Sequence, residues 1–111
     1  MTTTVKVLIP AKIAENSQTT QYTATGVKAI IDKFTATNYS GGAQSLSVNI
    51  VTSGDTAGNQ NLIKKTKTLQ AGETYTFPEI AGQSLEAGDF ISTLASAATS
   101  INIRCSGREI S

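Results

Sequence analysis

The feature that most constrains the fold is a series of short segments in which apolar and polar residues alternate, separated by turns that contain glycine. The clearest segment places Leu46, Val48 and Ile50 on one face of a strand and Ser47 and Asn49 on the other. We therefore expect the three apolar side chains to face a core and the two polar ones to face water.

The alternating segments predict about eight strands, because turn signals recur between them at the spacing typical of all-β domains. The expected strands are 3–9, 18–25, 27–38, 44–52, 61–69, 73–80, 89–95 and 99–109. Segment 27–34 is also compatible with a helix, but the flanking Thr and Asn residues favour a strand. Pro10 is expected to end the first strand because proline has no N–H to donate.

Two turns share a pattern, Leu-Gln-Ala-Gly-Glu at 69–73 and Leu-Glu-Ala-Gly-Asp at 85–89. We interpret each as a turn between two antiparallel strands. The 111 residues are expected to form one domain, 1–111, with a Thr-rich N-terminal arm at 1–4. The predicted fold is an all-β, antiparallel β-sandwich of the jelly-roll type, and an immunoglobulin-like sandwich is the alternative.

Charge and hydropathy argue against nucleic acid and membrane as partners. The chain has 9 Lys and Arg against 8 Asp and Glu, with a formal net charge of +1. Its one basic cluster is Lys64, Lys65 and Lys67, in which alternation would place Lys65 and Lys67 on the same face. Lysines of this kind typically protect an edge strand from unwanted pairing.

The apolar runs are far too short to span a bilayer, and no signal-peptide core is present, so we expect synthesis in a cytoplasm.

The chain has no histidine, which removes the common Ser-His-Asp and Cys-His nucleophile systems and most zinc sites. Its single cysteine, Cys105, alternates with Ile101 and Ile103 and is expected to be a buried apolar residue. The carboxylates that could form an acid–base pair lie in or beside turns, where they are usually solvated: Glu73, Glu79, Glu86 and Asp89. We therefore expect no enzymatic activity, no catalytic residue and no cofactor.

Two further kinds of site are poorly supported. Asp55 and Asn59 lie in a glycine-containing loop, but calcium prefers six or more oxygen ligands, so we expect turn formers and no metal site. Sugar platforms typically use exposed aromatic rings, and the chain has no Trp. Tyr22 and Tyr75 are expected to be half-buried, which leaves Tyr39 as the exposed ring.

Several runs spread over the chain resemble one family. They are Val-Leu-Ile-Pro-Ala-Lys at 7–12, Gln-Thr-Thr-Gln-Tyr-Thr-Ala at 18–24, Ala-Ile-Ile-Asp-Lys-Phe at 29–34, Gly-Glu-Thr-Tyr-Thr at 72–76 and Ile-Arg-Cys-Ser-Gly-Arg-Glu-Ile at 103–110. Together they resemble the small capsid decoration, or cement, proteins of short-tailed bacteriophages. The resemblance implies a jelly roll on the outer surface of the virion that binds the major capsid protein as a homodimer and clamps neighbouring subunits around the packaged DNA. It carries over no catalytic residues.

A surface rich in Thr, Ser, Gln and Asn, with 15% charged residues, suits a subunit that its neighbours cover. We expect contacts from the N-terminal segment, as an arm followed by an edge strand, and from the loop 53–60. An ordinary edge strand within one sandwich fits the first segment equally well. The candidate contact residues are Thr2, Thr3, Thr4, Val5, Val7, Ile9, Asp55 and Asn59.

Two other functions remain open. One is a component of a phage tail or baseplate, which the residues themselves do not distinguish from a capsid protein. The other is a β-sandwich adhesin module that binds glycans, and the lack of Trp and of an acidic or metal-binding cluster argues against it.

Overall fold

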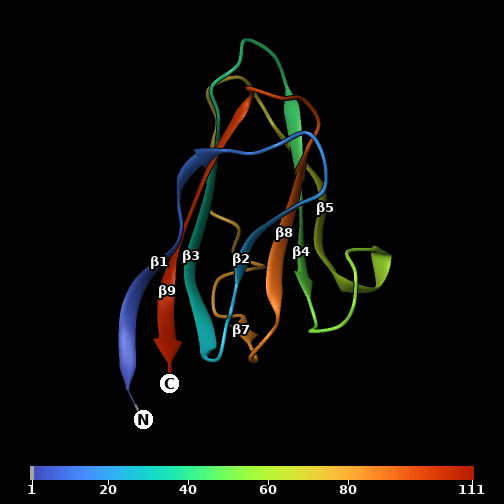
Figure 1. Ribbon diagram of the computed structural model, residues 1–111. Helices are drawn as coiled ribbons and strands as arrows, with labels where there is room; N and C mark the ends of the chain where they lie inside the picture. Colours follow the sequence, from blue (N-terminus) through green and yellow to red (C-terminus); the bar gives the residue numbers. More distant parts are fainter. Residues whose placement is uncertain (1) are drawn as a thin grey trace.

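The computed structural model describes residues 2–111, which form two antiparallel sheets packed face to face (Figure 1). Sheet A has the strand order β1-β9-β3-β6, with the short β7 also paired to β3, and sheet B has the order β2-β8-β4-β5. The strands are β1 (Thr3–Ile13), β2 (Thr19–Thr23), β3 (Lys28–Asn38), β4 (Gln44–Val51), β5 (Leu62–Leu69), β6 (Thr74–Tyr75), β7 (Ser84–Leu85), β8 (Phe90–Ala95) and β9 (Ile101–Ile110).

This strand order confirms the predicted jelly roll. The first strand pairs with the last, β2 with β8, β3 with both β6 and β7, and β4 with β5, so the chain resembles a long hairpin folded over on itself. An immunoglobulin-like sandwich would place its first two strands side by side in one sheet. Here β1 and β2 belong to different sheets, so that alternative is wrong.

Two strand boundaries differ from the predictions. Pro10 does not end the first strand, because β1 continues to Ile13 and its register against β9 shifts between Ile9 and Lys12. Proline is tolerated at such an irregularity on an edge strand, where its missing N–H breaks no ladder. The expected strand 73–80 is limited to β6 and is followed by a turn that carries Phe77 and Ile80 into the core.

The two segments with the shared sequence pattern both form turns, as predicted, and the turns have the same hydrogen bonds. The carboxylate of Glu73 accepts a bond from the Gln70 N–H at 2.7 Å, and that of Asp89 accepts one from the Glu86 N–H at 2.9 Å. The glycine before each carboxylate has a positive φ, which glycine adopts without strain. Each turn carries the chain from one sheet to the other, however, so neither forms a hairpin.

The core lies between the sheets and is almost entirely apolar. Phe34 from β3 meets Phe77 edge to face, with 5.2 Å between ring centroids. Ile101, Ile103 and Cys105 are all buried, as their alternation predicted. Burial raises the pKa of the Cys105 thiol to about 12, so the group stays protonated and behaves as a small apolar side chain.

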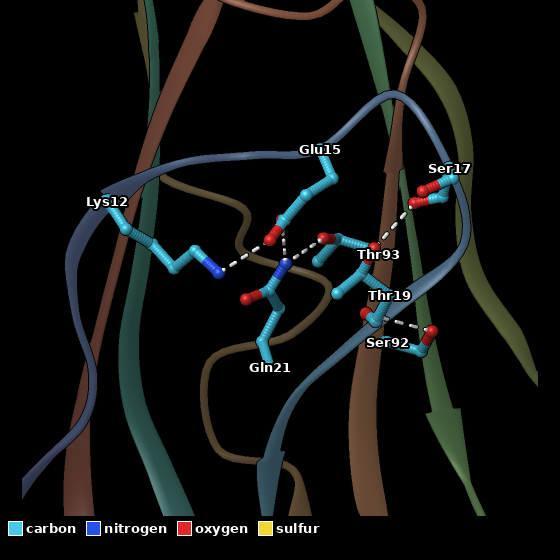
Figure 2. Close-up of polar contacts among 7 residues, drawn as sticks. All are labelled: Lys12, Glu15, Ser17, Thr19, Gln21, Ser92 and Thr93. Carbon is cyan, nitrogen blue, oxygen red and sulfur yellow. Dashed lines mark hydrogen bonds and ion pairs between the residues drawn. The ribbon is translucent and has the colours of Figure 1, made fainter.

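Polar side chains close one open side of the sandwich, between β1 and β2 (Figure 2). The carboxylate of Glu15 accepts hydrogen bonds from Lys12 Nζ at 2.9 Å and from Gln21 Nε2 at 2.8 Å. The same Gln21 nitrogen lies 3.0 Å from Thr93 Oγ1 on β8. These bonds lower the pKa of Glu15, so the side chain remains a carboxylate that ties the connection between β1 and β2 to sheet B.

The opposite side is closed by β5 and the segment after β6. Lys64 Nζ and Tyr75 Oη donate to Glu79 at 3.0 and 2.9 Å, and Lys67 Nζ lies 4.4 Å from the centre of the Tyr75 ring. Lys64 and Lys67 therefore lie on the same side of β5, and the prediction that Lys65 and Lys67 share a face is wrong. Thr66 breaks the alternation, because its φ of 44° turns the strand. The prediction that these lysines lie on an edge strand is confirmed.

We expect Gly107→Ala to lower the free energy of unfolding by roughly 1–3 kcal/mol or more, the cost of overpacking a close contact. A Cβ at Gly107 would lie 2.1 Å from the carbonyl oxygen of Ile30 and 2.9 Å from Leu8 Cδ1, where β9 passes between its neighbours. Gly41→Ala is the matched control, since a Cβ there meets open space. Urea unfolding of both variants checks this, and equal stabilities would contradict the close packing around β9.

Candidate functional site

Strand β1 forms the outer edge of sheet A and is the main candidate for a contact surface. One of its edges pairs with β9 from Thr3 opposite Ile110 to Ile13 opposite Asn102. Its other edge pairs with no strand among residues 2–111. The strand has 11 residues, so it offers a long row of backbone donors and acceptors to another chain.

The side chains along this edge are unusually apolar for an exposed strand. Val5 is 83% exposed, Val7 40% and Ile13 45%. Alternation along this segment places Val5, Val7 and Ile9 on one core-facing side, and for Val5 and Val7 this prediction is wrong. Leu8 and Ile9 are both buried instead, because the register against β9 shifts between Val7 and Ile9. Ile9 is therefore a core residue and is not available as the contact residue that the sequence suggested.

The segment expected to form an arm continues this strand. Thr3 and Thr4 belong to β1, and Thr2 exchanges two backbone hydrogen bonds of 2.9 Å with Ser111. Met1 lies outside the described residues. The described part of 1–4 is therefore the exposed end of a paired strand, next to the C-terminus (Figure 1).

An ionic contact anchors β1 to the rest of the sandwich. Glu109 on β9 lies 3.1 Å from Lys6 Nζ on β1 and accepts a 2.5 Å hydrogen bond from Tyr22 Oη on β2. The Tyr22 hydroxyl, followed by Lys6, lowers the pKa of Glu109. Burial and the neighbouring carboxylate raise the pKa of Tyr22. The ring of Tyr22 packs in the core while its hydroxyl links the two sheets.

A shallow hollow of about 620 Å³ adjoins the beginning of β1. It is mostly apolar, and its lining includes Val27, Lys28 and Ile110. Ile110 pairs with Thr3 on one side and with Lys28 on the other, so the hollow and the exposed start of β1 lie at the same end of sheet A. A partner that reached this end would meet both features.

The second group of predicted contact residues lies elsewhere. The loop 53–60 runs into a short 3-10 helix, η1 (Asn59–Asn61), and projects from the end of β4 on the far side of the molecule from β1 (Figure 1). The carboxylate of Asp55 accepts bonds from the Thr56 N–H at 2.8 Å and from Gln60 and Asn61. These bonds lower its pKa. Asp55 therefore shapes the loop, and the structure does not bring it near β1.

The other carboxylates considered from the sequence also have partners. Glu73 and Asp89 accept the turn hydrogen bonds described above, Glu79 binds Lys64 and Tyr75, and Glu86 lies 3.7 Å from Lys28. Within residues 2–111, no group of three or more His, Cys, Asp or Glu side chains is placed to hold a metal ion. The same part of the chain contains no helix long and apolar enough to cross a membrane.

The sequence missed one member of the exposed edge. Ile13 was assigned to no strand, because Pro10 was expected to end the first one. The signal that could have found it is the sequence Pro-Ala-Lys-Ile itself, since a proline on an edge strand is compatible with a strand that continues past it.

We expect Tyr22→Phe to lower the free energy of unfolding by about 1–3 kcal/mol at pH 7, because it removes a hydrogen bond to a charged group. Glu109 has a lowered pKa, so this stabilisation is present above the ordinary glutamate pKa and is lost as the pH falls through the lowered one. The difference between the two proteins should therefore shrink at about pH 3. Urea unfolding at both pH values tests this, and a difference that is independent of pH would contradict it.

Comparisons with protein-family models, with curated protein sequences and with solved structures found no significant match.

Proposed function

We propose that the protein is a non-enzymatic structural component of a bacteriophage virion, which binds the outer surface of the capsid and clamps neighbouring copies of the major capsid protein. The sequence resemblance supports the assignment to this family of capsid proteins. The exposed edge of β1 is the surface that we expect to bind the capsid.

The observation that carries the proposal is the open edge of β1 with Val5 and Val7 exposed on it. Natural edge strands are usually shortened, charged or covered, because an exposed apolar edge pairs with other chains. Here Lys6 is held by Glu109, and Pro10 lies beyond the two valines, so the first half of the edge stays open. A strand from a capsid subunit, or from a second copy in a homodimer, would add to sheet A at this place.

The low charge of the surface supports an assembly role. Neutral hydroxyl and amide groups cost far less to bury in an interface than charged groups do. On a repeating lattice, a dimer that binds two neighbouring sites gains from the high effective concentration of the second site. Because such a protein binds the assembled shell and not the free subunits, it would stabilise the shell by mass action.

We expect Val5→Lys to weaken binding to phage heads about tenfold or more, since a charge replaces an apolar side chain in the centre of the contact. The measurement is co-sedimentation with heads that lack the protein, with unassembled capsid protein as a separate arm. Thr20→Lys is the matched control, because Thr20 is an exposed residue on β2, the edge strand of the other sheet.

The proposal is supported if the protein binds heads saturably, if Val5→Lys weakens this binding, and if Thr20→Lys leaves it unchanged. Binding to isolated tails alone would replace it with a tail or baseplate component. Equal binding by the two variants would show that the edge of β1 is not the contact surface.

A further inference from the structure

The outer face of sheet B carries a polar groove that the proposed capsid contact does not use. Two adjoining hollows of about 210 and 310 Å³ form it, and both are lined by Ser47, Thr66 and Leu94. The hollow of about 210 Å³ is also lined by Gln18, Asn49 and Asn59. The groove lies on β4, β5 and β8, whereas the exposed edge described above belongs to sheet A.

The floor of the groove is polar and yet buried. Ser47 is 8% exposed and Asn49 2%, so the prediction that both face water is wrong. Neighbouring polar groups hold Asn49 in place: its Nδ2 donates to the Gly58 carbonyl at 3.0 Å and to Asn61 Oδ1 at 2.7 Å. A floor that the fold already holds in place costs little entropy to order when a ligand binds.

Several hydrogen-bonding groups of the groove remain available to a ligand. Gln18 uses its Nε2 to donate to Ser92 Oγ at 2.7 Å, and its Oε1 makes no hydrogen bond within residues 2–111. Ser47 Oγ accepts the Thr66 N–H at 2.8 Å, which leaves the hydroxyl proton free to be donated. Asn59 is exposed at the rim, and its side-chain amide makes no hydrogen bond to the described part of the chain.

Thr66 holds a strained position between the two hollows. Its φ of 44° lies in the left-handed region, which is a genuine outlier for a β-branched residue. Glycine would fit this backbone better, yet the sequence places a threonine there, with its side chain exposed at the groove. Backbone strain of this kind is enriched at functional sites.

The chemistry of the lining selects the class of ligand. The groove offers amide and hydroxyl groups, which both donate and accept, beside the apolar side chains of Leu62 and Leu94. Among the described residues no carboxylate lines the groove, which therefore does not suit a cation. The one charged residue that they contribute, Lys65, is too little to hold a nucleic-acid backbone. A sugar ring has a matching surface, with hydroxyls around its rim and C–H groups on its faces.

We propose that this groove binds a neutral oligosaccharide, with Gln18, Ser47, Asn59 and Thr66 contacting its hydroxyls and Leu94 contacting a ring face. The site needs no exposed aromatic platform, because its concave shape and fixed polar floor supply the orientation that a flat ring would supply elsewhere. The proposal is independent of capsid binding, since the two surfaces belong to different sheets.

The test is a ¹H–¹⁵N NMR titration of the whole chain with a panel of trisaccharides of glucose, galactose, mannose, rhamnose and N-acetylglucosamine. We expect at least one of them to shift the amide resonances of Ser47, Asn59, Thr66 and Leu94 and to leave those of β1 unchanged. For that sugar, Thr66→Gly and Asn59→Ala should each raise the Kd about tenfold, the loss expected when a bound hydroxyl loses a partner.

Thr99→Gly is the matched control, because Thr99 has a φ of 51° and does not line the groove. Both glycine variants relieve the same kind of strain and both make the unfolded chain more flexible, so the two should have similar melting temperatures, and only Thr66→Gly should weaken sugar binding. The proposal is overturned if no trisaccharide shifts the groove resonances at millimolar concentration. It is overturned as well if Thr66→Gly and Thr99→Gly bind the sugar equally well.

Discussion

The pairing of the first strand with the last is the interaction on which the rest of the structure depends. Strand β9 lies between β1 and β3, and its inner face supplies Ile101, Ile103 and Cys105 to the core. Because β1 pairs with β9 alone among residues 2–111, this ladder also decides which edge of sheet A stays open. The close approach of Gly107 to β3 and the contact of Glu109 with Lys6 and Tyr22 both lie on β9, so the same strand sets the packing and the electrostatics of the exposed edge.

Three carboxylates lie where the two sheets meet. The carboxylates of Glu15, Glu79 and Glu109 each accept bonds from a lysine and from a neutral side chain at an open side of the sandwich. In partly exposed pairs the hydrogen bonds matter more than the net attraction, because solvent screens the charges. Elsewhere the two sheets present different surfaces. Apolar side chains lie along the edge of β1, whereas buried amides and hydroxyls lie on the outer face of sheet B.

The sequence predicted the fold class well because alternation and turn chemistry are local signals. It placed seven of the strands close to their observed positions and identified the buried face of β9, since a period of two fixes which residues share a face. It was wrong where the period of two is not kept: in β1, Val5 and Val7 are exposed while Leu8 and Ile9 are both buried, and the positive φ of Thr66 moves Lys64 beside Lys67. The buried positions of Ser47 and Asn49 depend on partners from distant segments, such as Gln18 and Gly58, which alternation does not reveal.

The position of β9 also decides when the protein can fold during its synthesis. The ten-residue strand β9 lies in the middle of sheet A, so β1 and β3 have no common neighbour until β9 has been synthesised. Sheet B can pair earlier, because β2, β4, β5 and β8 all precede β9 in the chain, but its inner face has nothing to pack against. We therefore expect the two sheets to pack together only once β9 has been made, because the central pairings of sheet A join segments that are far apart in the chain.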